Sequence, residues 1–127
     1  MLAPWSKQYC EEEFPKYWEI VYSILQLFDK NSRVLEIGCG LGDVTAMLCY
    51  LGFKHVTSLE KDEQISRAAQ RRIVDMFGMN GVVRNENYPS NKQYTADILI
   101  LVNCVYADQL KTKREYVDLI QKYYVCA

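Results

Sequence analysis

The alternation of apolar and polar positions along the chain predicts a series of helices and strands. Apolar side chains spaced three, four and seven residues apart predict a first helix over residues 14–29, with Pro15 near its start. The apolar face of this helix comprises Phe14, Tyr17, Trp18, Val21, Ile24, Leu25 and Phe28. Short runs of apolar or β-branched residues predict strands at residues 33–37, 55–60, 81–84 and 97–102.

Helical periodicity returns between the strands. After the first strand, a short helix is predicted that ends at Gly52, with apolar positions Val44, Met47, Leu48 and Leu51. After the second strand, Asp62 can cap a helix that ends at Gly78, with an apolar stripe of Ile65, Ala68, Ala69, Ile73 and Met76. Its solvated face is predicted to carry Arg67, Arg71 and Arg72, balanced by acids. A last helix is predicted over residues 112–124, after a capping-box pattern.

This order of elements predicts one α/β domain. Strands that alternate with helices, without repeats or linkers, are typical of a Rossmann-like, doubly wound and mainly parallel sheet. The 127 residues divide into an N-terminal segment (1–13), the leading helix (14–29), a core (32–106) and the last helix (112–124). In the usual strand order the fourth strand lies at the sheet edge, and a long apolar edge recruits further strands. A second copy of the chain is therefore expected to be able to pair along the fourth strand.

Composition argues against several classes of function. The net charge of −1 offers no long-range attraction for nucleic acid or an anionic membrane. No run of about 18 apolar residues, the length needed to span a bilayer, is present. The five cysteines are odd in number and never spaced as C-x-x-C, and His55 is the single histidine, so neither a disulfide framework nor a metal site is expected. With no apolar signal-peptide core, the expected location is a reducing cytoplasm.

Three alternating glycines follow the first strand and lead into the next helix. Gly38, Gly40 and Gly42 are more than an ordinary strand–helix turn needs, and glycine there lets a ligand approach the backbone closely. A dinucleotide fingerprint, G-x-G-x-x-G, would place its third glycine at position 43, which is Asp43. An aspartate at the helix start would also repel a pyrophosphate. A dinucleotide-binding protein is therefore the less favoured interpretation.

The pattern E-x-G-x-G-x-G resembles the first motif of the class I S-adenosylmethionine-dependent methyltransferases. A carboxylate in that motif suits a ligand that carries an ammonium and a sulfonium group. The resemblance implies that the methionine part of the cofactor is faced by Glu36, Gly38, Cys39, Gly40 and Gly42. Glu60, at the end of the second strand, is an acid placed to accept both ribose hydroxyls.

The same resemblance implies further contacts to the cofactor. Lys61, which follows the ribose acid, would cover the adenine with its methylene stem. In the loop after the third strand, Glu86 or Asn87 is the preferred partner for the adenine amino group, and Asn85 is a further candidate. Asn103 would lie near the cofactor at the end of the fourth strand. The segment that begins there is similar to the N-P-P-Y motif of amino-group methyltransferases, without its prolines.

The implied activity is methyl transfer from S-adenosylmethionine to an N, O, S or C nucleophile, with S-adenosylhomocysteine as product. Such catalysis depends on alignment and exclusion of water, so the sequence identifies no catalytic residue. The methyl-acceptor substrate is not readable from the sequence. A full domain of the resembled family continues past the fourth strand, so the resemblance implies that this chain lacks the C-terminal strands of the full fold. Two alternatives stay open: a module that binds S-adenosylmethionine without catalysis, and the cofactor-binding fragment of a larger methyltransferase.

Overall fold

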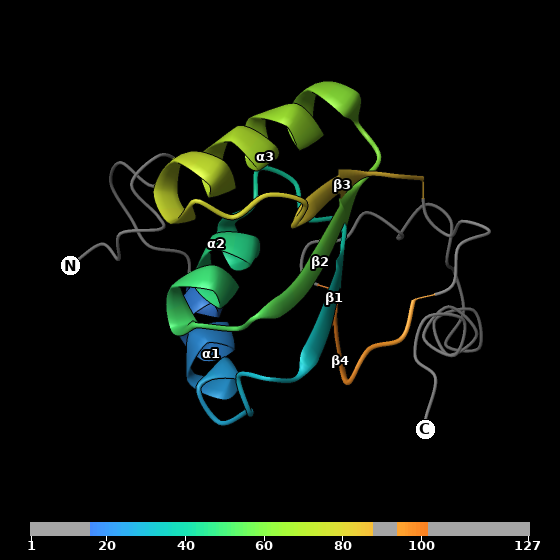
Figure 1. Ribbon diagram of the computed structural model, residues 1–127. Coiled ribbons are helices and arrows are strands. Elements are labelled where there is room, and N and C mark those ends of the chain that lie inside the picture. Colours follow the sequence, from blue (N-terminus) through green and yellow to red (C-terminus); the bar gives the residue numbers. More distant parts are fainter. Residues whose placement is uncertain (1–15, 88–93, 102–127) are drawn as a thin grey trace.

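The computed structural model describes residues 16–87 and 94–101. In this part the order of elements is α1 (Lys16–Leu25), β1 (Arg33–Ile37), α2 (Asp43–Leu51), β2 (His55–Glu60), α3 (Glu63–Phe77), β3 (Val83–Asn85) and β4 (Ile98–Ile100) (Figure 1). The predicted alternation of helices and strands is confirmed over these residues. The predicted N-terminal segment 1–13, the predicted helix 112–124 and Asn103 lie outside the described residues.

The four strands form one parallel sheet in the order β3–β2–β1–β4. β1 lies between β2 and β4, and its pairing with β2 runs from Arg33 opposite His55 to Ile37 opposite Leu59. Parallel pairing brings the carboxyl ends of β1 and β2 to the same edge of the sheet, which is where such folds bind ligands. Among the described strands β4 is an edge strand, as predicted.

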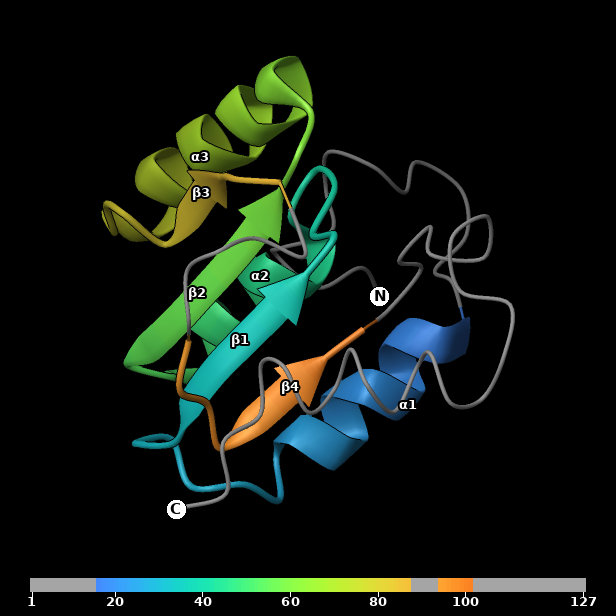
Figure 2. The same cartoon turned by 90° about the vertical axis from the view of Figure 1, so that its right-hand side faces the viewer.

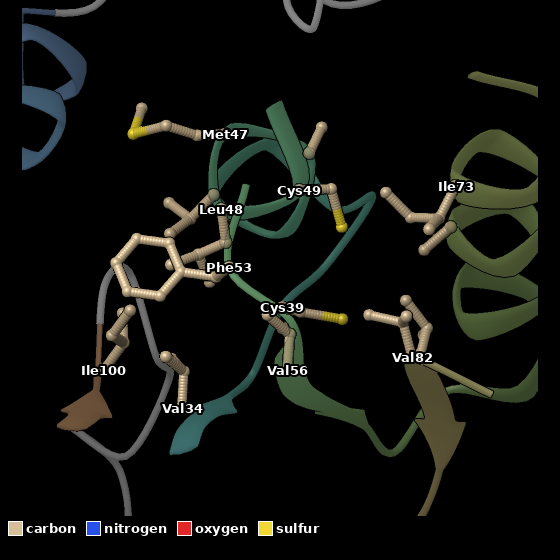
Figure 3. Packing of buried hydrophobic residues seen from close by; sticks show 14 of the residues in the cluster. Val34, Cys39, Met47, Leu48, Cys49, Phe53, Val56, Ile73, Val82 and Ile100 are labelled. Atoms are coloured by element: carbon tan, nitrogen blue, oxygen red, sulfur yellow. The ribbon is translucent and has the colours of Figure 1, made fainter. Parts of the chain in front are cut away.

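The three described helices lie on the same face of the sheet (Figures 1 and 2). A core cluster on this face includes Val34 and Val56 from the sheet, Leu48 from α2 and Ile73 from α3 (Figure 3). A second, smaller cluster contains Leu35, Ile37, Leu59 and Ala96. Side chains alternate between the two faces along a strand, so Val34 and Glu36 face the helices while Leu35 and Ile37 face the other way. The functional consequence is that Glu36 points beneath α2.

The first helix is shorter than predicted and ends at Leu25. The Lys30 ammonium donates hydrogen bonds to the carbonyls of Leu25, Gln26 and Phe28, at 3.1, 3.3 and 2.9 Å. The last carbonyls of a helix have no intrahelical partner, and a cation there also suits the negative end of the helix dipole. The same ammonium lies 4.7 Å from the centroid of the Phe53 ring. Lys30 therefore fixes the turn that leads from α1 into β1.

The predicted apolar face of α1 is only partly buried, which corrects the expectation of one continuous face. Leu25 is buried, whereas Ile24 is 50% and Phe28 43% exposed. Phe28 follows the helix in the turn, so it no longer continues the helical stripe. The helix packs on the core through Leu25, with Val21 and Tyr22 partly buried against it.

Two strands are shorter than the sequence indicated. β3 begins at Val83 because Gly81 has a positive φ of 76°, outside the extended region that a strand requires. β4 is confined to Ile98–Ile100 within the described residues, and Ile98 and Leu99 are only partly buried. The prediction of a strand buried on both faces is therefore met only at Ile100.

An ion pair joins the starts of the central strand and the edge strand. Asp97 Oδ2 accepts from the backbone N–H and Nε of Arg33 at 2.8 and 3.1 Å, and Oδ1 accepts from Nη2 at 2.9 Å. The Asp97 N–H donates back to the Arg33 carbonyl at 2.8 Å. These four bonds set the register of β4 on β1.

The Arg33–Asp97 pair predicts a small acid-dependent loss of stability. Hydrogen bonds from Arg33 lower the pKa of Asp97 from 3.8 to about 2. A lowered folded-state pKa gives stability that is present above pH 3.8 and is lost as pH falls through about 2. Asp97→Asn should remove this part of the acid unfolding curve, measured by circular dichroism at low salt. Both side chains are about half exposed, so salt should weaken the effect. An unchanged acid curve would contradict the assignment.

Candidate functional site

The glycine turn connects the end of β1 to the start of α2. Gly38, Gly40 and Gly42 have φ values of 74°, 56° and 88°, a region that side chains with a Cβ rarely adopt. The N–H groups of Gly38 and Cys39 both donate to the Leu59 carbonyl, at 2.9 and 3.0 Å. The turn is thereby fastened to β2, and all three predicted glycines have the conformation that explains their presence.

The two predicted parts of the site meet in the structure. Glu60 Oε1 accepts a hydrogen bond from the Gly40 N–H at 3.0 Å, and Oε2 accepts from the Asp62 N–H at 2.9 Å. Glu60 is 7% exposed, so these bonds are shielded from bulk water. Asp62 in turn caps α3 by accepting from the Ile65 N–H at 3.0 Å, which confirms the predicted cap. One carboxylate therefore joins the glycine turn, the end of β2 and the start of α3.

The glycines of the turn differ in their surroundings. A Cβ placed on Gly40 would meet no atom within 4 Å, so there is open space beside its backbone. A Cβ placed on Gly42 would lie 3.4 Å from the Cβ of Ala69 on α3. Gly42 therefore serves helix packing, whereas Gly40 leaves room for a ligand next to Glu60.

Close packing at Gly42 also corrects the predicted stripe of α3. Ile65 is 38% exposed, and Ser66, Ala69, Arg72 and Ile73 are the buried positions. The small side chains of Ser66 and Ala69 let the helix approach the turn. Ala69 and Ile73 are buried as predicted and Met76 is partly buried against the core, so only the start of the stripe differs, with Ser66 buried in place of Ile65.

Arg72 was predicted on the solvated face of α3, and this prediction is wrong. Its side chain is 1% exposed, and Nη1 donates to Asp43 Oδ1 at 2.7 Å and to the Leu41 carbonyl at 3.3 Å. Burial raises the pKa of Asp43, and the Arg72 guanidinium opposes that rise. Asp43, which excluded a dinucleotide fingerprint, thus has a structural partner. The pair ties the start of α2 to the middle of α3. Arg67 and Arg71 are exposed as predicted.

Glu36 is enclosed beneath the turn. It is 2% exposed, and its Oε1 lies 2.6 Å from Thr45 Oγ1 and 2.9 Å from Ser58 Oγ. The two hydroxyls lie 3.0 Å from each other. Burial raises the pKa of Glu36 to about 7. The sequence analysis missed Thr45 and Ser58, whose only signal is a polar residue at an otherwise apolar position of α2 and of β2.

The candidate adenine residues lie around the end of β3. The Asn85 amide donates to the carbonyls of Glu60 and Lys61, both at 3.0 Å, and so holds the strand ends together. The Glu86 carboxylate accepts from the Tyr94 hydroxyl. Lys61 and Asn87 are exposed. Lys61, Glu86 and Asn87 are therefore placed beyond Glu60, on the side away from β1.

Cys39 lies inside the glycine turn as a protonated thiol. It is buried, its Sγ lies 3.6 Å from the Gly40 carbonyl, and burial raises its pKa. A thiol is a poor nucleophile, since the thiolate is the reactive form. Among residues 16–87 and 94–101 no group of three or more His, Cys, Asp or Glu side chains could hold a metal ion. The same residues include no helix long and apolar enough to cross a membrane.

A cavity of about 380 Å³ lies away from the glycine turn. It is lined near the amino ends of β1 and β2 by residues that include Arg33, Lys54, His55 and Thr57. The carboxyl ends of the strands, with the glycine turn and Glu60, are the opposite end of the sheet. The carboxyl ends are the candidate functional site, because the converging polar groups and the open space at Gly40 are there.

Several solved structures share the fold of this chain. YjhP of E. coli matches with a TM-score of 0.62 and 17% identity, over 95% of this chain and 50% of that one. A candidate RNA methyltransferase of Pyrococcus horikoshii matches with a TM-score of 0.59 and 18% identity, over 84% of this chain and 50% of that one. An S-adenosylmethionine-dependent methyltransferase of Thiobacillus denitrificans, solved with S-adenosyl-L-homocysteine, matches with a TM-score of 0.52 and 17% identity, over 90% and 53%. The chain spans about half the length of these structures, and the shared part is the Rossmann-like, mainly parallel sheet.

Sequence comparison identifies the family. No curated protein sequence matches the chain. The family model described as protein-L-isoaspartate(D-aspartate) O-methyltransferase (PCMT) matches residues 14–86. This range is more than half of the 127 residues, and it contains the glycine turn, Glu36 and Glu60. The chain belongs to the protein-L-isoaspartate(D-aspartate) O-methyltransferase family, in agreement with the resemblance of Glu36–Gly42 to the first motif of class I methyltransferases.

Proposed function

We propose that the chain binds S-adenosylmethionine at the carboxyl ends of β1 and β2 and acts as a methyltransferase. The observation that carries the proposal is the 3.0 Å hydrogen bond from the Gly40 N–H to Glu60, beside open space at Gly40. Each oxygen of Glu60 accepts one backbone N–H, and a carboxylate oxygen has two acceptor positions. Each oxygen therefore keeps one position for a ribose hydroxyl.

The other site residues would take the roles expected from the sequence, except Glu36, which is enclosed beneath the turn and would support the turn rather than face the cofactor. The backbone of Gly38–Gly42, including Cys39, would lie along the methionine part, with Glu36 beneath it. The Lys61 stem would cover the adenine, and Glu86 or Asn87 would receive the adenine amino group. Asn103 keeps its proposed place near the cofactor. The family match over residues 14–86 includes Gly38–Gly42, Glu36, Lys61 and Glu86 and supports their assignments as a set, whereas Asn87 and Asn103 lie outside the matched range.

The bound cofactor would supply an electrophilic methyl group. The chain would position the cofactor and exclude water from it. The glycine turn and the buried Glu60 would hold the amino-acid part and the ribose, which would fix the sulfonium in one place. Methyl transfer by direct displacement depends on alignment and on exclusion of water. We therefore assign no general base among the described residues.

The methyl acceptor is proposed from the family. Its name points to a carboxyl oxygen of an isoaspartyl residue, whereas one solved structure of the same fold is a candidate RNA methyltransferase. We favour the carboxyl acceptor because the net charge of −1 gives no general attraction for nucleic acid. A cofactor-binding module without catalysis is the second candidate, since the chain spans about half of the solved structures.

Calorimetric titration tests cofactor binding. We expect S-adenosylmethionine and S-adenosylhomocysteine to bind with a Kd on the order of micromolar, about −8 kcal/mol, and NAD not to bind. The reason is that Asp43 and its partner Arg72 occupy the place where a dinucleotide fingerprint has a glycine. Binding of NAD alone would refute the proposal.

Transfer of labelled methyl groups separates the two candidates. The panel should contain an isoaspartyl peptide, the matching aspartyl peptide and a tRNA mixture. Label in the isoaspartyl peptide alone would support the carboxyl acceptor. Label in RNA alone would refute the carboxyl acceptor but would still support methyl transfer by this chain. Binding without transfer to any acceptor would favour the cofactor-binding module.

Two further properties are proposed with the function. The buried free thiols of Cys39 and Cys49 suit a reducing cytoplasm. β4 is an edge strand among those described, so a second copy of the chain could pair along it. Sedimentation with and without cofactor would show whether the chain associates.

A further inference from the structure

Three buried oxygen atoms form a closed triangle beneath the glycine turn. Glu36 Oε1 lies 2.6 Å from Thr45 Oγ1 and 2.9 Å from Ser58 Oγ, and the two hydroxyl oxygens lie 3.0 Å apart. Glu36 is 2% exposed, and Thr45 and Ser58 are fully buried. The three residues come from β1, α2 and β2, which are the elements that position the turn and Glu60. We refer to these atoms as the oxygen triangle.

The number of hydrogen atoms decides how many sides of the triangle can be hydrogen bonds. Each hydroxyl carries one hydrogen atom, so Thr45 and Ser58 together supply two. An ionised carboxylate supplies none, and one of the three short contacts would then join two oxygens with no hydrogen between them. A protonated carboxyl supplies the third hydrogen. Glu36 can then donate to Ser58, Ser58 to Thr45 and Thr45 to Glu36, and all three contacts become hydrogen bonds.

The charged groups around the triangle do not favour an anion. Burial is the main cause that raises the pKa of Glu36, and the hydroxyls of Thr45 and Ser58 lower it in part. The negative charge of Asp43 on α2 raises this pKa further, and Arg72 of α3 is engaged with Asp43. On β2, the nearest acid is Glu60, two residues beyond Ser58. The thiols of Cys39 in the turn and Cys49 on α2 have raised pKa values and are neutral. No cation is hydrogen-bonded to Glu36 among the described residues, and burial without a cation disfavours the charged form.

We propose that Glu36 carries a proton in the free protein, and that this proton closes a hydrogen-bonded ring that joins β1, β2 and α2. When the pH rises, the carboxyl O–H bond breaks and the proton passes to solvent. Both hydroxyls then turn toward the carboxylate, and the bond between Thr45 and Ser58 is lost. The ring is thus a pH-sensitive set of hydrogen bonds that holds β1, β2 and α2 together beneath the glycine turn. It does not depend on which cofactor binds.

The sign of the pH effect follows from the direction of the shift. The pKa of Glu36 is raised by burial from 4.5 to about 7, so between these values the folded chain holds a proton that the unfolded chain has released. Stability from this group is fully present below pH 4.5 and is lost as pH rises to about 7. One proton changes the unfolding equilibrium constant by about tenfold per pH unit in that range. Ordinary carboxylates in ion pairs, such as Asp97, give the opposite slope.

Two measurements on the full chain test the proposal. The first is an NMR titration of the side-chain carboxyl carbons, in which the Glu36 signal is identified by its absence from Glu36→Gln. We expect this signal to titrate near neutral pH in the wild type. In Ser58→Ala, which removes two of the three sides of the oxygen triangle, we expect it to titrate at a different pH. The second is urea unfolding between pH 5 and 8. We expect the free energy of unfolding of the wild type to fall as pH rises. Glu36→Gln is similar in shape but does not titrate, so its free energy of unfolding should lack the part of this pH dependence that comes from Glu36.

The titration of the wild type decides the proposal even if a variant fails to fold. In that case Ser58→Ala, or the count of carboxyl signals that titrate above pH 6, replaces the missing assignment. No carboxyl signal titrating near neutral pH, with all glutamate signals near the ordinary value of 4.5, would overturn it. Equal pH slopes for the wild type and Glu36→Gln would overturn it as well. Neither measurement uses a cofactor, so a failure to bind S-adenosylmethionine would refute the proposed function and leave this proposal intact.

Discussion

Arg72→Leu is expected to lower the free energy of unfolding by about 3 kcal/mol, near the low end for loss of one partner from a buried ion pair. The guanidinium is 1% exposed and binds Asp43 at 2.7 Å and the Leu41 carbonyl at 3.3 Å. Leucine would fill part of the space but leave a carboxylate without its cation. The Asp43 side chain is 25% exposed, so water can hydrate it in part, and for this reason we expect the lower end of the range.

Arg67→Leu is the matched control, because it removes the same group from the same helix. The Arg67 side chain is 69% exposed and pairs with Glu63 one turn earlier, at 2.6 Å. Exposed pairs of this kind contribute about 0.3–0.5 kcal/mol. Adding Asp43→Asn to Arg72→Leu should restore part of the loss, since the unpaired charge is then gone. Urea unfolding measures all three variants. Equal losses for Arg72→Leu and Arg67→Leu would show that burial of Arg72 has no energetic role.

Glu60→Ala is expected to weaken the binding of S-adenosylhomocysteine by about ten- to a hundredfold, or 1–3 kcal/mol, the usual value for hydrogen bonds to a charged group. The change removes the acceptors for both ribose hydroxyls. It also leaves the N–H groups of Gly40 and Asp62 without the carboxylate that they bind at 3.0 and 2.9 Å. The turn would therefore lose part of its preorganisation together with the direct contacts.

Glu63→Ala is the control for Glu60→Ala, because Glu63 is an acid three residues further along the chain. The Glu63 side chain is 64% exposed and pairs with Arg67 on the surface of α3, so cofactor binding should not change. Gly40→Val provides an independent test. At a φ of 56° a valine is strained, and its side chain would extend into the open space beside the turn. Calorimetry should show little or no binding. If Glu60→Ala and Gly40→Val both bind like the wild type, the cofactor site lies elsewhere.

Features that depend on a few consecutive residues could be predicted from the sequence. The positive φ values of the glycine turn, the Asp62 cap and the cap at Gly78 follow from local chemistry, and the structure has them. The proximity of Gly40 and Glu60 could also be predicted from the sequence, since adjacent parallel strands end at the same edge of a sheet. The PCMT family match agrees with the motif between Glu36 and Glu60.

Features that depend on how elements pack could not be predicted. Burial of Arg72 requires that α3 lie against the start of α2, which no periodicity in α3 alone reveals. The contact of Glu36 with Ser58 requires the strand register that places them opposite each other. Thr45 joins them only because α2 crosses that pair. For Glu36, Thr45 and Ser58 a polar residue within an apolar run was the visible signal, whereas Arg72 carried no such signal. In each case the partner lay on another element.

The parallel sheet has a consequence for how this chain folds. The Glu36–Ser58, Glu60–Asn85 and Arg33–Asp97 contacts join residues 22, 25 and 64 positions apart. Closing longer loops costs little extra free energy, but pairing between distant residues slows folding. During synthesis, β1 must leave the ribosome more than 60 residues before β4 can reach it. Until β4 is synthesised, the backbone N–H and C=O groups on one side of β1 therefore have no strand to pair with. During this period, pairing of β1 with a strand of another chain competes with correct folding.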